Sequence, residues 1–252
     1  MSLEGNVEYA LTRVQFQYGA RPDPGAWRRL EASHDLGQYL EGTRGSIFGP
    51  WIASLDRKRD AHAIERTLRG AWRNYVRTVA GWHPRRWQPW LMWLEWLPTL
   101  GLIAQLGRPG PVPDWLLADP IVGPVARGAS AERLAAVKGT VLTIFEPAIG
   151  GRVPLGDLWR ARWRELRPPV DAFTEQLLVA FSKTVQEHTR KLTVEGANGT
   201  VLRDQLRERL DRLFRAAAGT VVATLCHLAL MALDFERLRG GLVNRALFPR
   251  GG

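Results

Sequence analysis

The sequence predicts an all-α protein, and three observations favour that class over any fold with a sheet. Apolar residues recur every three or four positions in most segments, which is the spacing of one face of a helix. No segment long enough to count alternates apolar and polar residues as a half-buried strand does. Pro and Gly separate many of the helical segments. We therefore expect a bundle of roughly eight to ten helices.

The first helices are expected to be short. Residues 6–18 carry apolar side chains at helical spacing, and Gly19 follows as a stop. Asp23 and Pro24 are the residue types preferred at the cap and in the first turn of a second helix. A third short helix is expected over residues 36–40, before a corner rich in glycine.

A longer helix is expected from Asp60 to Gly81 because apolar residues keep the helical spacing throughout. His62 and Glu65 lie one turn apart, a spacing that metal sites also use. No second carboxylate or histidine cluster accompanies them, so a solvated helix face is the favoured interpretation. No metal site is expected.

Residues 82–97 are rich in tryptophan, with Trp87, Trp90, Trp93 and Trp96 at intervals of three. On a helix these rings form a stripe, and the favoured interpretation is core packing against the C-terminal helix, because aromatic side chains dominate core energetics. Two alternatives treat the stripe as a binding surface. The first is an interface with a protein or a membrane, which would use the adjacent arginines as well. The second is a stacking platform for single-stranded nucleic acid.

The chain is expected to divide at residues 107–128, where prolines and glycines are too dense for a helix interior or a central strand. This connection would separate an N-terminal helical region, 1–106, from a C-terminal helical region, 129–248. Three further helices are expected to start in the C-terminal region, at Ser130, at Pro154 and after the pair Pro168-Pro169.

The C-terminal region is expected to end in one long helix over residues 200–248, around which the rest of the chain packs. Its first half is amphipathic, whereas residues 216–233 carry no formal charge. That run is diluted by polar residues and follows a charged helix, so we expect it to be buried by protein rather than by lipid. Gly240 and Gly241 are expected to end the helix.

The chain is strongly basic, with a net charge of +10 and a pI of about 10.7. This charge permits an acidic partner, such as nucleic acid, an anionic membrane or an acidic protein surface. Most of the positive charge is arginine, an enrichment that biased codon usage would also produce. The charge alone therefore does not select a partner.

No pattern of catalytic residues is present in the sequence. It contains no phosphate-binding glycine loop, dinucleotide motif, nucleophile elbow or zinc-protease motif. His227 is best interpreted as a hydrogen-bonded core histidine, and Cys226 beside it points about 100° away on a helix. We expect neither an enzyme nor a bound cofactor. The N-terminal residues do not match a secretory signal and Cys226 is the only cysteine, so a cytoplasmic location is expected.

Two stretches together resemble the C/d (AC39) subunit family of V/A-type rotary ATPases. The first is Tyr9–Gly19, which is similar to the opening helix of that family. The second is Leu228–Phe248, which is similar to a recurring helix end in which an acidic residue precedes a polar residue, Leu or Ile, and Arg. The residues that match this helix end are Asp234, Glu236, Arg237, Leu238 and Arg239.

The resemblance implies an all-α funnel of repeated helical bundles, in a divergent and short member of the family. It implies a non-catalytic collar that couples the central stalk to the proteolipid ring on the cytoplasmic face of a membrane, touching that membrane only indirectly. The candidate partner-binding residues are Arg85, Arg86, Trp87, Trp90, Asp234, Glu236, Arg237 and Arg239. The alternative function is an Arg/Trp-rich nucleic-acid-binding protein. Its arginines are spread along the chain and balanced locally by acids, which counts against it.

Overall fold

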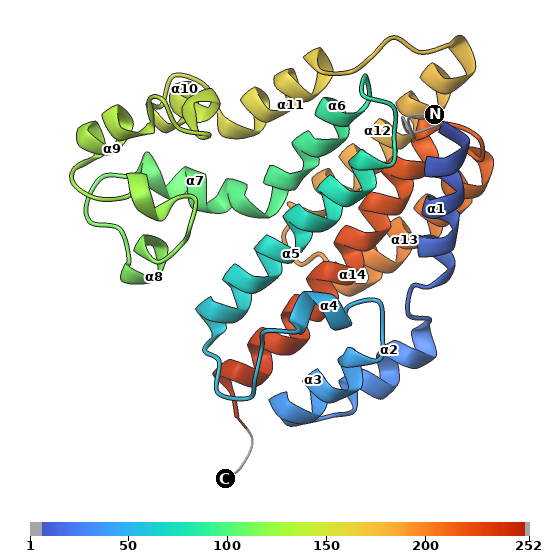
Figure 1. The fold of residues 1–252 in the computed structure, drawn as a ribbon, viewed down its shortest axis with the longest axis horizontal. Coiled ribbons are helices and arrows are strands. Elements are labelled where there is room, and N and C mark those ends of the chain that lie inside the picture. Colours follow the sequence, from blue (N-terminus) through green and yellow to red (C-terminus); the bar gives the residue numbers. More distant parts are fainter. Residues whose placement is uncertain (1–6, 250–252) are drawn as a thin grey trace, which may run out of the picture. The chain divides into compact units, whose positions relative to one another are not determined.

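The computed structural model describes residues 7–249, and every regular element in that range is a helix (Figure 1). This confirms the predicted all-α, multi-helix fold. Residues 1–6 lie outside the described range. They include the first position of the expected first helix and part of the stretch that lacks a secretory signal.

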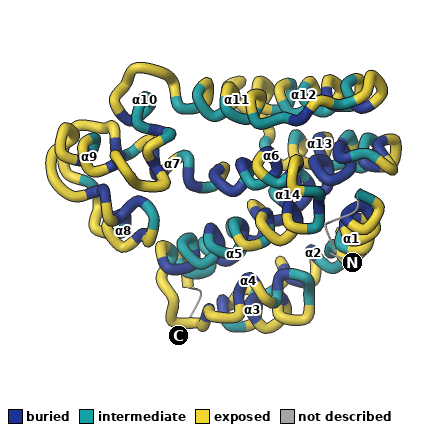
Figure 2. The backbone as a smooth tube through the Cα atoms, turned by 45° about the horizontal axis from the view of Figure 1, so that its top comes forward, coloured by how far each residue is buried: buried dark blue, intermediate teal, exposed yellow. Residues whose placement is uncertain are grey.

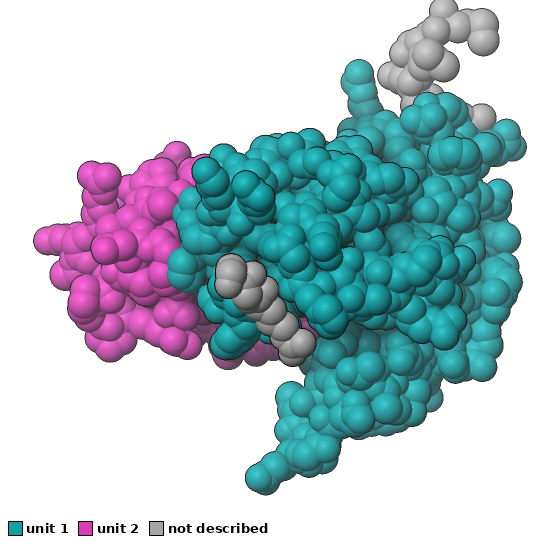
Figure 3. Space-filling view, turned by 90° about the horizontal axis from the view of Figure 1, so that it is seen from below, with its two compact units in different colours: residues 1–91, 168–252 teal, residues 92–167 magenta. Residues whose placement is uncertain are grey.

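The chain forms two compact units (Figure 3). The first contains the residues up to Leu91 and those from Pro168 onward, and the second is Met92–Arg167. The predicted division at residues 107–128 differs from this one, because that segment lies inside the second unit. Its prolines and glycines shape turns that bring Leu116 and Val122 into a buried cluster, so the segment is not a linker.

The first unit is built from helices that begin at predictable residues. The carboxylates of Asp23 and Asp60 each accept the N–H of the third residue along, as the sequence predicts, and Asp35 and Asp171 do the same. Its helices are α1 (Val7–Gly19), α2 (Pro24–Glu31), α3 (Leu36–Arg44), α4 (Gly49–Ile52), α5 (Ala61–Gly81), α12 (Ala172–Leu192), α13 (Gly199–Ala216) and α14 (Val221–Leu247), together with α6 (Gln88–Met92) except for its last residue.

Helix α14 is the centre of the first unit. It packs against α1, α3, α5, α12 and α13, and Figure 1 shows it between α5 and α13. From Val221 to Leu228 every residue of α14 is buried. This confirms that protein covers the part of the uncharged run that lies in α14, whereas Ala216, Ala218 and Gly219 before it are exposed.

The expected long helix over residues 200–248 is two helices, so that prediction is wrong. Helix α13 ends at Ala216, and Gly219 adopts a left-handed φ of +84° in the turn that follows. The Thr220 hydroxyl then caps α14 by accepting the Val222 N–H. The predicted stop at Gly240 and Gly241 is also wrong, because α14 continues through both to Leu247.

The second unit surrounds its own apolar cluster. Trp93 stacks on Phe145 with ring centroids 5.4 Å apart, and its indole N–H donates to the Trp159 carbonyl at 3.0 Å. Its elements are η1 (Trp93–Thr99), α7 (Leu100–Leu106), α8 (Asp114–Leu117), η2 (Gly123–Val125), α9 (Ser130–Val137), η3 (Thr143–Phe145), α10 (Glu146–Ile149) and α11 (Leu155–Glu165).

The tryptophan-rich segment is not one continuous helix. Helix α6 ends at Met92 and the chain continues as the 3₁₀ helix η1, which contains Pro98. Trp93 and Trp96 therefore join the core of the second unit. The core interpretation of the stripe is confirmed, since Trp87, Trp90, Trp93 and Trp96 are all buried, and the last two belong to the apolar cluster of the second unit.

Candidate partner-binding site

Asp234 lies in α14 with a fully buried side chain beside two guanidinium groups. Arg21, between α1 and α2, places Nε 2.7 Å from Oδ2, and Arg207 of α13 places Nη1 2.8 Å from Oδ1. Arg21 also lies 3.6 Å from the Asp211 carboxylate, to which the Tyr18 hydroxyl donates at 3.0 Å. A buried carboxylate without cations would carry a large desolvation cost. This charge network therefore ties α14 to α13 and to the chain that follows α1.

Arg237 joins α14 to α2. Its Nε and Nη2 lie 2.5 Å and 2.7 Å from the two carboxylate oxygens of Glu31, a paired geometry that only a planar guanidinium provides. The guanidinium also lies 5.0 Å from the centroid of the Trp27 ring. The hydrogen bond to Glu31 raises the pKa of Arg237 above its ordinary value.

Arg239 joins α14 to α5. Its Nε donates to Glu65 Oε1 at 2.7 Å, and its Nη1 donates to Glu236 Oε2 at 3.1 Å. Hydrogen bonding to Glu65 raises the pKa of Arg239 as well. Glu236 is the exposed acid of this segment, so it faces solvent while the other three residues hold the helix in place.

The four predicted residues of α14 thus take part in three separate sets of ion pairs, each of which joins α14 to another part of the first unit. Asp234 is too deeply buried to touch a partner. Glu236, Arg237 and Arg239 line a polar pocket of about 510 Å³. The other residues that line it are Glu31, Thr200, Arg203, Asp204, Arg207, Leu233, Gly240 and Gly241. Because acids and bases both line the walls, the pocket suits a surface that carries both signs of charge.

The predicted residues near α6 separate into two kinds. Arg85 and Arg86 are exposed in the turn before α6, and the Arg86 guanidinium lies 5.6 Å from the centroid of the Trp87 ring. Trp87 is 7% exposed and Trp90 is 0% exposed. The prediction that these two rings form a partner surface is therefore corrected, because packing covers them. The arginine pair remains a candidate contact.

Two buried histidines form short polar contacts in the first unit. His227 Nε2 lies 2.6 Å from the Tyr75 hydroxyl oxygen, and His83 Nε2 lies 3.0 Å from the Thr224 hydroxyl oxygen. Burial lowers the pKa of His227 to about 3 and that of His83 to about 4, so both are neutral at pH 7. The interpretation of His227 as a hydrogen-bonded core residue is confirmed.

The neighbouring Cys226 thiol is buried, and burial raises its pKa to about 12. A thiol in that environment stays protonated at pH 7 and is a poor nucleophile. Among residues 7–249 no group of three or more His, Cys, Asp or Glu side chains is placed to hold a metal ion. Cys226, His83 and His227 are therefore part of the packed core of the first unit.

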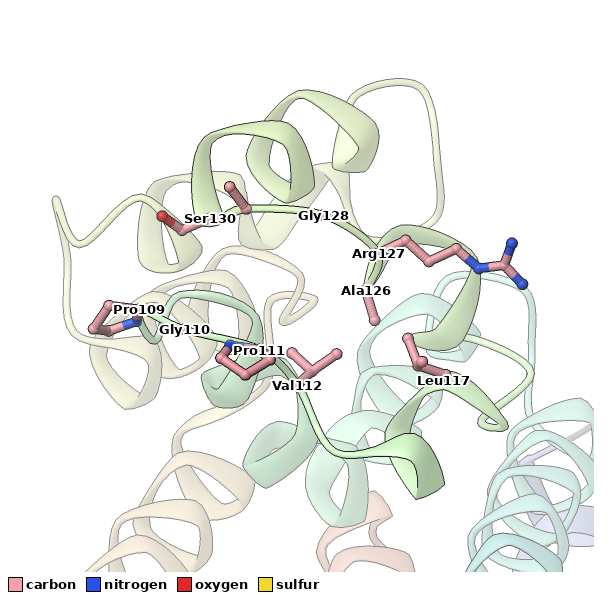
Figure 4. Close-up of a pocket in the computed structure, with 10 residues that line it drawn as sticks. Pro109, Gly110, Pro111, Val112, Leu117, Ala126, Arg127, Gly128 and Ser130 are labelled. Carbon is pink, nitrogen blue, oxygen red and sulfur yellow. The ribbon is translucent and has the colours of Figure 1, made fainter.

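The second unit contains a pocket of about 590 Å³ whose walls are loops rich in proline and glycine (Figure 4). Arg133 is buried behind these loops and donates to the carbonyls of Leu106, Gly110 and Gly128 at 2.8–3.1 Å, and to that of Arg108 at 2.5 Å. One side chain therefore fixes both walls. Arg127 has the one charged side chain among the ten described residues that line the pocket, so the pocket offers binding surface without acid–base groups.

The sequence interpretation did not identify the partners of the α14 residues, namely Arg21, Glu31, Glu65 and Arg207. One signal was available: a lone aspartate that follows a long uncharged run must be buried with cations. Which arginines supply them depends on contacts across the fold. None of the helices in the described range is long and apolar enough to span a bilayer. No protein-family model, curated protein or solved structure matches the chain.

Proposed function

We propose that the chain is a non-catalytic subunit of a V/A-type rotary ATPase, or of a related ion-translocating membrane complex, and that it couples the central stalk to the proteolipid ring. The observation that carries this proposal is the meeting of the two stretches that resemble the C/d family. The first stretch lies in α1, which packs against α14, where most of the second stretch lies. Just after the first stretch, Arg21 lies 2.7 Å from Asp234 in the second. The matching segments thus form one structural unit.

A second line of support is the way α14 is held. A subunit that couples a rotating shaft to a ring has to transmit force, so its central helix must not slide. Buried or paired charges on α14 connect it to α2, α5 and α13 through Arg237, Arg239 and Asp234. In the proposed function the exposed Glu236, the mixed-charge pocket and the pair Arg85 and Arg86 meet other subunits, and the chain lies on the inner face of the membrane without crossing it.

Co-purification from native membranes tests the proposal. The tagged chain is expected to retain the proteolipid ring and stalk subunits, and Arg85→Glu with Arg86→Glu is expected to lose the ring. Arg28→Glu with Arg29→Glu is the matched control, because it reverses another exposed arginine pair, on α2. Recovery of the wild-type chain alone in the soluble fraction would contradict the proposal, as would equal loss of the ring in both variants.

The nucleic-acid alternative is less favoured because the tryptophan stripe on which it was based is not exposed. Bases stack on exposed rings, whereas Trp87 and Trp90 are buried. A gel shift at low and high salt tests what remains of the alternative, since binding through phosphates weakens steeply with salt. The proposed function predicts no salt-sensitive shift with single-stranded DNA or RNA.

A further inference from the structure

Helices α12 and α13 form a helical hairpin with an exposed turn. The hairpin is held together by an ion pair of 2.7 Å between Glu187 and Arg209. At the turn, Gly196 adopts a φ of +76°, and the Asn198 side chain caps α13. We call residues 190–203 the hairpin tip. Figure 2 shows α12 mostly as exposed and intermediate, and only Thr174 and Leu178 are buried in it.

The hairpin tip exposes aliphatic side chains. Leu192, Val194 and Val201 are 42%, 62% and 48% exposed. Single exposed apolar residues are ordinary on a protein surface. Three of them close to one turn expose an apolar patch, which is typical of a surface that contacts a partner.

Cations surround these aliphatic residues. Arg190, Lys191 and Arg203 are exposed, and none of them takes part in an ion pair within the described part of the chain. Glu195 is the one acid between Arg190 and Arg203. The tip is therefore positively charged as well as apolar.

We infer that the hairpin tip binds the surface of an anionic phospholipid bilayer. Its aliphatic side chains enter the boundary between headgroups and acyl chains, while Arg190 and Lys191 lie among the lipid phosphates. This combination of apolar insertion and basic charge is what interfacial binding requires. It extends the proposed function, in which the membrane is reached through the ring, and it does not depend on that function.

The composition of the tip favours lipid over other anionic partners. No aromatic residue lies between Arg190 and Arg203, so the tip offers nothing on which bases could stack. An acidic protein surface would pair with the cations, but it would bury the exposed valines only if it also carried an apolar patch that matches them. A bilayer interface accommodates both.

Co-sedimentation of the purified full chain with protein-free vesicles tests the inference. Wild type is expected to bind phosphatidylcholine vesicles that contain phosphatidylserine, more weakly at high salt, and to bind pure phosphatidylcholine poorly. Arg190→Gln with Lys191→Gln is expected to lower the partition coefficient by about 30-fold, since each basic residue near the surface contributes about 1 kcal/mol. Leu192→Gln with Val194→Gln is expected to lower it as well.

Matched controls use the same changes elsewhere. Arg57→Gln with Lys58→Gln removes another exposed Arg-Lys pair, and Val141→Gln with Val179→Gln removes two other exposed aliphatic side chains. Both control variants are expected to bind as wild type does. Equal weakening by the control variants would overturn the inference, because it would mean that adsorption depends only on net charge or on general hydrophobicity.

A fluorescent probe at Val194→Cys gives a measurement that does not depend on weakened variants. The native Cys226 is buried, so an environment-sensitive thiol dye labels the new cysteine. Anionic vesicles are expected to shift its emission to shorter wavelength, while the same dye at Val141→Cys stays unchanged. Absence of wild-type binding to anionic vesicles, or an unshifted probe at position 194, overturns the inference. Binding confined to RNA or to a soluble acidic protein overturns it too. Co-purification with the proteolipid ring is measured independently of vesicle binding, so either proposal can be contradicted without the other.

Discussion

Arg21 and Asp234 are 213 positions apart in the chain, and their side chains lie 2.7 Å apart. The carboxylate is fully buried and the guanidinium nearly so, at 0% and 9% side-chain exposure. Within the first unit, the ion pair therefore links the chain just after α1 to the middle of α14. Because water does not screen it, losing either partner leaves a charge in a place where it cannot be solvated.

We expect Asp234→Asn to destabilise the protein by about 3–5 kcal/mol, because Arg21 and Arg207 would lose the buried carboxylate that they share and Arg21 would keep only the more distant Asp211. Urea unfolding followed by circular dichroism measures this. Glu236→Gln is the control on the same helix, and its exposed pair with Arg239 should contribute less than about 1 kcal/mol. Equal effects of the two changes would mean that the Asp234 network does not hold α14.

Gly240 and Gly241 should respond to alanine in opposite ways. A Cβ on Gly241 would collide with the Tyr39 hydroxyl, whereas one on Gly240 meets no atom within 4 Å. Gly240→Ala should stabilise α14 by up to about 1 kcal/mol through helix propensity. Gly241→Ala should destabilise by about 1–3 kcal/mol through overpacking. Thermal melts of both variants measure the difference, and Tyr39→Phe should recover part of the Gly241→Ala loss. A stabilising Gly241→Ala would show that Tyr39 moves freely.

The buried histidines should make the protein less stable in mild acid. Folding lowers the pKa of His227 to about 3 and of His83 to about 4, mainly by desolvation. Below the unfolded pKa of about 6.5, the unfolded chain therefore binds protons that the folded chain does not, and stability falls as pH falls. Each histidine should cost about 2 kcal/mol between pH 7 and pH 5.

Urea unfolding of wild type and of His83→Gln with His227→Gln, at pH 7 and pH 5, measures this contribution. The loss between the two pH values should be smaller by about 4 kcal/mol in the double variant. NMR titration of wild type gives a direct check, since both imidazoles should stay neutral at pH 5. An ordinary pKa for either imidazole would mean that this histidine does not contribute to the loss of stability in mild acid.

Arg133 should keep the loops around the pocket of the second unit well ordered. Arg133→Met leaves the carbonyls of Leu106, Arg108, Gly110 and Gly128 without their donor, so we expect a loss of about 3 kcal/mol or more. Amide hydrogen exchange should rise in both loops. Arg152→Met removes an exposed pair with Glu146 and should change neither stability nor exchange appreciably. Unchanged exchange in Arg133→Met would mean that the loops are held by their prolines alone.

The sequence by itself determined the helical class, the aspartate caps at Asp23 and Asp60, and the burial of the uncharged run. These depend on local spacing and on short-range hydrogen bonds, which neighbouring residues are enough to specify. The structural roles of the glycines and prolines were ambiguous, because neighbouring residues are not enough to specify them. Gly219 forms the turn between α13 and α14, whereas Gly241 lies inside α14, where the Tyr39 side chain occupies the space of a Cβ. Residues 107–128 fold into a core although their composition resembles a linker.

Only the tertiary structure decided which arginines neutralise Asp234, and that Trp87 and Trp90 are covered while Arg85 and Arg86 are not. It also decided that the acidic and basic residues at the end of α14 pair mainly within the chain. Each of these outcomes depends on which helices meet. A buried charge requires an opposite charge within a few ångströms, but its position in the sequence leaves open where along the chain that partner lies.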